Sequence, residues 1–168
     1  MRPVLVGIAP SRPGSEGQPL SALGGRSTGA TLAELAGLSA SQYMMRFDRV
    51  NLCATTQAST IRTSVGRPYA EMLAGSLLRG RRVVLLGMNV VECFGLEEFR
   101  CDLAEWFDTR EIRPQAGWAG YRAGMVPPFN YAILPHPSGR NRWYNEPANR
   151  ERARAFMTEL AEGWEGAD

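Results

Sequence analysis

The side chains best suited to chemistry gather in one short stretch, residues 132–145. This stretch contains His136, the single histidine of the chain, which follows an apolar run and stands between Pro135 and Pro137. Histidine changes its charge near neutral pH, so a histidine held on a stiff turn after a strand suits a reactive site. The alternative is that His136 only satisfies a backbone group at the end of that strand.

The residues that follow His136 are of the kinds that bind nucleic acids. Arginine, hydroxyl and amide side chains donate hydrogen bonds to phosphates, and aromatic rings stack on bases. The candidates for nucleic-acid contact are Ser138, Arg140, Asn141, Arg142 and Trp143. For Trp143 and its neighbour Tyr144, packing against a following helix is the alternative.

The length and composition are those of an ordinary globular chain. Its 168 residues predict a single domain, residues 1–168, and the 44% of hydrophobic residues exclude a disordered or collagen-like chain. No apolar run approaches the roughly 20 residues needed to cross a bilayer. The N-terminal sequence leads directly into an apolar strand and not into a signal peptide. We therefore expect an intracellular, cytoplasmic protein that acts as a monomer and has no membrane partner.

The charge is nearly balanced, with a formal net charge of +2 at pH 7. All 19 basic residues are arginines, which a GC-rich coding sequence could explain. The planar guanidinium also suits bidentate contacts with phosphates. A local basic patch could therefore bind nucleic acid, with an affinity that falls as salt rises. The charge run at residues 150–154 is expected to be a solvated helix face.

The three cysteines, Cys53, Cys93 and Cys101, form no CxxC pair. Together with a single histidine they make no convincing set of zinc ligands. Disulfides are rare in intracellular domains. We expect three reduced cysteines, with Cys53 a core residue in a strand, and neither a metal nor another cofactor.

Hydrophobic runs and capping signals predict strands that alternate with helices. The expected strands are Val4–Ile8, Arg49–Ala54, Arg82–Leu86 and Asn130–Leu134. The expected helices run from a cap at Ser27 or Thr28 to about Gly37, over Ala40–Arg46 after a Ser39/Gln42 capping box, over Gly66–Leu78, from Asn89, and after a cap at Asn145 with Pro147 in the first turn. This order predicts an α/β fold, a three-layer α/β/α sandwich around a central, largely parallel sheet.

Four of these strand ends coincide with unusual connecting segments, at residues 7–11, 53–57, 87–89 and 134–141. In open α/β sheets, ligands bind beyond the carboxyl ends of the strands, so we expect these segments to meet at one edge. The segment 9–29 is rich in Gly, Pro and Ser. Long loops inside a compact domain are usually functional, although a linker is the alternative.

Four short motifs follow one another along the chain. They are GIAPS at 7–11 with GQPL at 17–20, Asn51 in a strand, VVLLG at 83–87 and HPS at 136–138. In this order they resemble the uracil-DNA glycosylase superfamily, and the resemblance covers most of the chain. It implies a uracil-DNA glycosylase-like fold and hydrolysis of the bond that joins uracil, or a related base, to DNA. The DNA would be single- or double-stranded, and in a bacterial host the protein would be associated with the nucleoid.

The same resemblance implies roles for individual residues. His136 would donate a hydrogen bond to a carbonyl oxygen of the leaving base. Asn51 would read the edge of a base swung out of the stack, unless it is a satisfied polar residue in a strand. Backbone amides around Ala9 and Pro10 would line the base pocket, next to Leu20.

Two residues of the first long loop are candidates for handling the attacking water. Glu16 is the only carboxylate of that loop and could activate the water, whereas a solvated surface glutamate is the alternative. Ser11 could orient the water instead.

The chain also departs from the superfamily's pattern. Ala9 and Ile8 stand where different branches carry an acid, and Leu20 stands where many members carry a phenylalanine. The four cysteines that hold an iron–sulfur cluster in some branches are absent, and GRNRWYN follows HPS in place of a proline–leucine wedge. Two other functions therefore stay open: an enzyme that acts on a modified base or nucleotide, and a catalytically silent module that binds DNA or a lesion.

Overall fold

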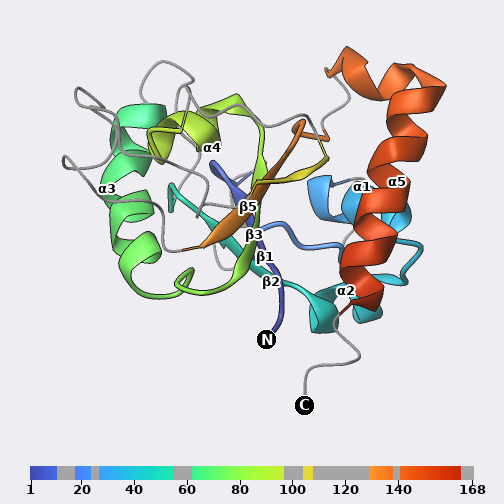
Figure 1. The fold of residues 1–168 in the computed structure, drawn as a ribbon, viewed down its shortest axis with the longest axis horizontal. Coiled ribbons are helices and arrows are strands. Elements are labelled where there is room, and N and C mark those ends of the chain that lie inside the picture. The colour runs from blue at the N-terminus through green and yellow to red at the C-terminus, as the bar shows by residue number, and fades with distance from the viewer. Residues whose placement is uncertain are drawn as a thin grey trace.

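The computed structural model describes residues 1–10, 18–23, 27–54, 62–96, 104–107, 129–137 and 141–163. Within these ranges the chain forms one five-stranded sheet, of order β2-β1-β3-β5-β4, with helices on both of its faces (Figure 1). The strands are β1 (Val4–Gly7), β2 (Asp48–Asn51), β3 (Arg82–Leu86), β4 (Trp106–Phe107) and β5 (Asn130–Leu134). The helices are α1 (Thr28–Leu35), α2 (Ala40–Arg46), α3 (Arg62–Gly75), α4 (Met88–Cys93), the 3₁₀ helix η3 (Arg142–Asn145) and α5 (Pro147–Glu162).

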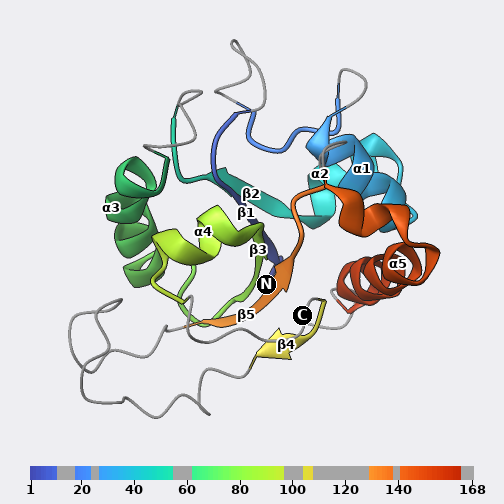
Figure 2. The same ribbon diagram turned by 90° about the horizontal axis from the view of Figure 1, so that it is seen from above.

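Four strands of the sheet, β2, β1, β3 and β5, run parallel, and the short β4 pairs antiparallel with β5 at one edge. Figure 2 shows α3 and α4 on one side of the sheet and α1, α2 and α5 on the other. The predicted three-layer α/β/α architecture with a largely parallel sheet is therefore confirmed. Among the helices that the structure describes, none is both long and apolar enough to span a bilayer.

Three of the strands, β1, β3 and β5, are apolar on both faces because both faces are covered. In β3, Val83 and Leu85 join the core beneath α3 and α4, whereas Val84 and Leu86 join the core beneath α1, α2 and α5. The same alternation along β1 and β5 divides their side chains between the two cores. This explains why the strands appear in the sequence as continuous hydrophobic runs and not as alternating ones.

The predicted caps of the first two helices are confirmed. The Ser27 hydroxyl caps α1 by accepting from the Ala30 N–H at 3.1 Å. Ser39 and Gln42 form the reciprocal capping box at the start of α2. Gly37, with φ +66°, ends α1 in the left-handed conformation that favours glycine. These boundaries depend on contacts between near neighbours, which is why the local sequence predicts them.

Several elements differ from the sequence prediction. The strand β2 ends at Asn51, so buried Cys53 lies just beyond it, although the N–H of Cys53 still donates to the carbonyl of Ile8. The helix α3 begins and ends earlier than predicted and carries Pro68 inside it. The prediction that Asn145 caps the last helix is wrong, because Asn145 belongs to η3 and Glu146 precedes α5. The strand β4 was not predicted, because two residues leave no periodic signal.

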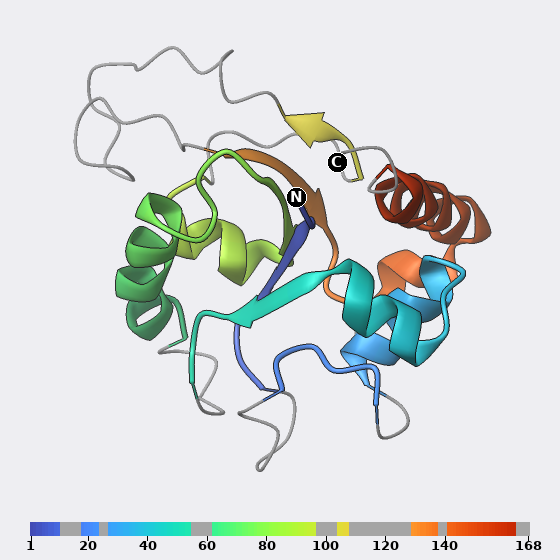
Figure 3. The same cartoon turned by 90° about the horizontal axis from the view of Figure 1, so that it is seen from below.

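The amino ends of the strands are closed by a buried arginine. Arg81, only 8% exposed, donates to the carboxylate of Asp48 and to the carbonyl of Arg2. Figure 3, seen from below, shows the chain entering β1 in the middle of this edge. These bonds tie the amino ends of the strands together, although Nε of Arg81 is buried and has no hydrogen-bond partner among the described residues. We call this end of the sheet the amino edge, and the opposite one, where the parallel strands end, the carboxyl edge.

The packing of α1 against the segment before it predicts a large effect of one methyl group. A Cβ at Gly29 would lie 2.1 Å from the carbonyl oxygen of Leu20 and 2.4 Å from that of Ser21. We expect Gly29→Ala to lower the free energy of unfolding by about 1–3 kcal/mol, because backbone must move. Gly75→Ala is the matched control, since nothing lies within 4 Å of its Cβ, and it should raise stability by up to about 1 kcal/mol. Equal urea midpoints for the two variants would contradict this packing.

Candidate functional site

Four strand ends meet at the carboxyl edge, as the sequence predicts. The parallel register places Gly7 of β1 opposite Asn51 of β2, and Leu86 of β3 opposite Leu134 of β5. Across the sheet, the strand ends therefore carry Asn51, then Gly7, then Gly87 just after β3, then His136 just after β5. Three strand spacings, about 14 Å, separate the backbone at the two outer positions.

Gly7 ends β1, and Gly87 directly follows β3. A polar residue lies close to each of these glycines. A Cβ on Gly7 would lie 2.5 Å from Oδ1 of Asn51. A Cβ on Gly87 would lie 3.1 Å from the Cβ of His136, and Gly87 has φ +90°. Both glycines are closely approached by these neighbours, and at Gly87 the positive φ itself favours glycine. Asn51 and Leu20 thus fill the space beside Gly7, and His136 lies against Gly87.

The side-chain oxygen of Asn51 is buried and accepts no hydrogen bond from the residues that the structure describes. Leaving a buried acceptor unpaired costs about 1–3 kcal/mol. Such groups are rare in folded proteins and need an explanation, such as a ligand or an ordered water. The half-buried Asn51 therefore has the properties of a residue that reads a hydrogen-bond donor of a bound molecule.

Leu20 reaches the same place from a strained turn. The Ser21 N–H donates to the carbonyl of Gln18 at 3.3 Å, which makes Pro19 and Leu20 the central residues of a β-turn. Leu20 has φ +51°, a conformation that usually requires glycine at this position of a turn. Its Cδ2 lies 3.1 Å from where a Cβ on Gly7 would be. An apolar side chain is thus held beside Asn51 at an energetic cost, which is typical of functional positions.

This turn is held by a buried tyrosine. The Tyr43 hydroxyl donates to the carbonyl of Leu20 at 3.2 Å, and the Ser27 hydroxyl donates to that of Ser21 at 2.7 Å. Burial raises the pKa of Tyr43, and the nearby Arg49 only partly opposes this effect. The phenol therefore stays a neutral donor at every physiological pH.

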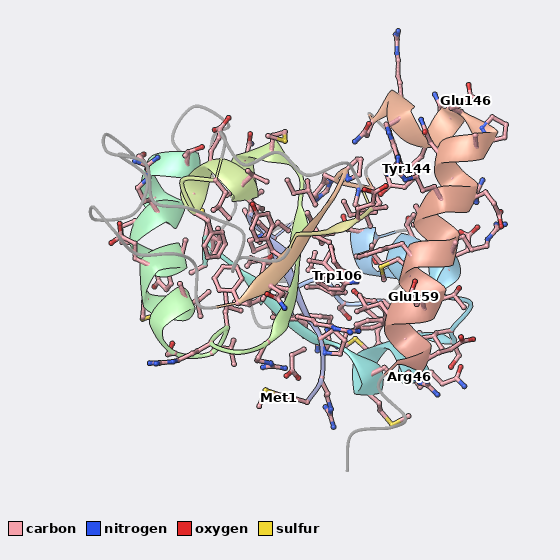
Figure 4. All side chains as sticks on the ribbon, in the orientation of Figure 1. Met1, Arg46, Trp106, Tyr144, Glu146 and Glu159 are labelled. Atoms are coloured by element: carbon pink, nitrogen blue, oxygen red, sulfur yellow. The ribbon has the colours of Figure 1, made fainter. Side chains whose placement is uncertain are left out.

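His136 is half-buried, between the buried Pro135 and Pro137. The carbonyl of His136 accepts from Nδ2 of Asn141 at 3.1 Å, and the carbonyl of Pro135 accepts from the Tyr144 hydroxyl at 2.7 Å. Figure 4 shows Tyr144 between the end of β5 and the first turns of α5. The sequence singled out His136 but gave Asn141 a different role and Tyr144 none in the site.

The predicted nucleic-acid contacts separate into two groups. Both polar ends of the Asn141 amide are bonded internally, since its Oδ1 also accepts from the Trp143 N–H at 3.0 Å. Trp143 and Tyr144 meet edge to face, with ring centroids 4.9 Å apart, and both pack against the core beneath α5, which was the alternative for them. Arg142 is exposed and is the described candidate that best suits contact with a phosphate.

The remaining site predictions fall into two sets. Ala9 is half-buried and packs against the core beneath α3 and α4, and Pro10 is buried. The predictions that lie outside the described residues are those for Ser11, Glu16, Ser138 and Arg140.

The sequence also gave expectations for metal binding, for the cysteines and for the charge run at residues 150–154. Among the described residues, no three His, Cys, Asp or Glu side chains gather closely enough to hold a metal ion. Cys53 and Cys93 are buried and unlinked. The charge run is a solvated helix face, as predicted: Arg150 pairs with Glu34 at 2.6 Å, and Arg154 with Glu151 at 2.7 Å.

Comparison with models of known protein families, with curated proteins and with solved structures finds no match to this chain. The fold and the geometry define the class as a three-layer α/β protein with polar residues gathered at the carboxyl edge of its parallel sheet. Function has to be argued from these residues, because a fold of this kind serves many chemistries.

Two half-buried asparagines should respond differently to the same truncation. Asn51→Ala removes an unpaired acceptor, so the recovered desolvation penalty should offset the lost contacts and keep stability within about 0.5 kcal/mol of wild type. Asn141→Ala removes two satisfied hydrogen bonds and should cost about 1–2 kcal/mol. Urea unfolding of both variants checks this. A loss at Asn51 as large as that at Asn141 would mean that Asn51 is an ordinary structural residue.

Proposed function

We propose that the protein is a DNA glycosylase, a hydrolase that removes uracil or a related base from DNA after swinging the nucleotide out of the stack. One observation carries the proposal: the buried, unpaired oxygen of Asn51 lies against Gly7 at the carboxyl edge, where His136 stands beside Gly87. The order of the motifs around these residues, which resembles that of uracil-DNA glycosylases, supports the same proposal.

In this proposal the base lies at the carboxyl edge, between Asn51 and His136. Because Oδ1 of Asn51 is an acceptor, it pairs with a ring N–H, such as N3–H of uracil. Cytosine has an acceptor at that ring position, so two acceptors would oppose each other there. A site built to bond one polar group rejects an analogue that lacks it, because the buried partner is left unpaired. Leu20 supplies the apolar contact beside this edge of the base.

His136 acts on the leaving group. When the bond between C1′ and the base nitrogen breaks, the electron pair goes to the base, and negative charge develops on its carbonyl oxygens. A hydrogen bond from the imidazole to one of these oxygens stabilises that charge. Water adds to C1′ and loses a proton, for which Glu16 is the proposed base and Ser11 the orienting group. Ser138, Arg140 and Arg142 are proposed to hold the phosphates.

A second candidate function has its own support. Ala9 offers no carboxylate for the water, and an aliphatic Leu20 replaces a stacking ring. Both residues favour either an enzyme for a modified base or nucleotide, or a silent module that binds DNA or a lesion. The glycosylase, the enzyme for a modified base or nucleotide, and the binding module differ in whether DNA that contains uracil is bound and whether uracil is released from it. One assay therefore distinguishes them.

Base release from oligonucleotides provides that assay. Wild-type protein is incubated with single- and double-stranded DNA that contains uracil, and alkali then cleaves any abasic site. We expect cleavage that falls by about 10²–10³-fold in His136→Ala, because a pre-organised donor is lost. Tight, salt-sensitive binding of wild type without release would contradict the glycosylase and favour the binding module. If uracil is neither bound nor released, a panel of modified bases and free nucleotides tests the second enzyme.

The proposed phosphate contact has a matched control on the opposite edge. Arg142→Ala should weaken binding of any DNA sequence several-fold and lower the slope of log K against log salt by about 1. Arg79→Ala removes an exposed arginine from the turn before β3, at the amino edge, and should change neither quantity. Fluorescence anisotropy across a salt series measures both. Equal effects of the two substitutions would place the DNA elsewhere.

A further inference from the structure

The backbone that carries His136 is bonded at three successive carbonyl groups. Leu134, the last residue of β5, accepts from the N–H of Gly87, just after β3, at 2.9 Å. Pro135 accepts from the Tyr144 hydroxyl at 2.7 Å, and His136 accepts from Nδ2 of Asn141 at 3.1 Å. The peptide groups on both sides of the histidine are therefore fixed after the strand has ended.

Beyond Leu134, side chains supply the hydrogen-bond donors to the carbonyls of Pro135 and His136. Pro135 and Pro137 have no N–H, so neither can donate to a ladder beyond Leu134. On the other side of β5, β4 pairs with Tyr131 and Ala132, and the N–H of Ala104 donates to the carbonyl of Ile133 at 2.9 Å. Bonds from side chains are the remaining means of holding these carbonyls in a half-buried segment.

The two donors are themselves well supported. Asn141 uses its Oδ1 as the cap of η3, which fixes the direction of its Nδ2. Asn149 of α5 donates to the carbonyl of Trp143 at 3.2 Å and ties η3 to the long helix. Burial raises the pKa of the Tyr144 phenol, so it remains a neutral donor over the whole working range.

We propose that Asn141 and Tyr144 are positioning residues, which fix the backbone of His136 and thereby aim its imidazole at the base. The statement that the imidazole is aimed at a base rests on the proposed function. The statement that the backbone of His136 is fixed rests on the contacts alone. Asn141 thereby has a role different from the DNA contact expected from the sequence. A reacting group that moves by about 1 Å can lose up to 10²-fold in rate, so loosening the segment has to be visible in catalysis.

Two isosteric substitutions separate positioning from capping and packing. Asn141→Asp keeps an oxygen that caps η3 but loses the donor to the His136 carbonyl. Tyr144→Phe keeps the packed ring and loses only the hydroxyl. Asn145→Asp puts the same charge at an exposed position of η3, and Tyr69→Phe removes a hydroxyl from an exposed tyrosine of α3. Thermal melting by circular dichroism establishes that each variant is folded, and Tyr144→Phe suffices if Asn141→Asp is not.

Two measurements are made on each folded variant. The first is the single-turnover rate of base release from DNA that contains uracil. The second is the NMR signal of the imidazole Cε1–H, which is unambiguous because the chain has one histidine. We expect Asn141→Asp and Tyr144→Phe each to slow release about tenfold relative to the matched control, with DNA affinity equal to that of the control, and to shift or split the imidazole signal.

An unchanged imidazole signal in both variants would overturn the proposal, whatever the rate. So would an altered signal with an unchanged rate. If wild-type protein releases no base, the proposed function fails on its own, and the imidazole signal alone then decides whether these two residues fix His136.

Discussion

The parallel register of β2, β1, β3 and β5 is the constraint on which the rest of this structure depends. Successive side chains of a strand point to opposite faces, so a slip by one residue would exchange the two cores. In β1, β3 and β5 the register is therefore fixed by burial of apolar side chains on both faces. The same register sets Gly7 against Asn51, and brings the end of β3 beside the segment that carries His136. The candidate site follows from how the core is packed.

The two edges of the sheet differ in how their polar groups are bonded. At the amino edge, Arg81 bonds Asp48 and the backbone of Arg2, so the strand ends are tied together, although Nε of Arg81 is also buried without a partner among the described residues. At the carboxyl edge, Asn51 keeps a buried unpaired oxygen, and Leu20 is held in a left-handed conformation. Unfavourable local features persist where the surrounding structure enforces them, and they concentrate at functional sites. Finding both within the same few ångströms is a reason, independent of any motif, to place the site at this edge.

The sequence predicts what depends on neighbours in the chain and on simple burial. The capping box of Ser39 and Gln42 joins residues three apart, and Arg82–Leu86 is a buried strand whose composition leaves little choice. The convergence of four strand ends also follows, because it needs only the rule for parallel sheets. The single histidine could be picked out because its residue type alone marks it as suited to chemistry.

Contacts between separate elements could not be predicted in this way. Asn141 and Trp143 have side chains suited to DNA, and only the path of the chain after β5 turns the amide inward and packs the ring. The hydroxyl of Tyr144 bonds the carbonyl of Pro135, nine residues earlier, and the local sequence does not specify this contact. The cap of α5 was misplaced for the same reason, because η3 takes up Asn145 before the helix begins. Side-chain type indicates what a residue can do, and the fold decides which of these uses is left.

How tightly the edge is built also bears on the choice between catalysis and binding alone. Binding and reacting groups both need to be held in place, and a reacting group is the more demanding, since rate falls steeply when geometry is lost. The segment around His136 is bonded at three successive carbonyls, lies against Gly87 and is flanked by two prolines. Under the proposed function, that fixation suits a histidine that acts on the leaving base. The absence of an acid at Ala9 does not weaken this argument, because stabilising the leaving base and activating the water are separate tasks, carried by different groups.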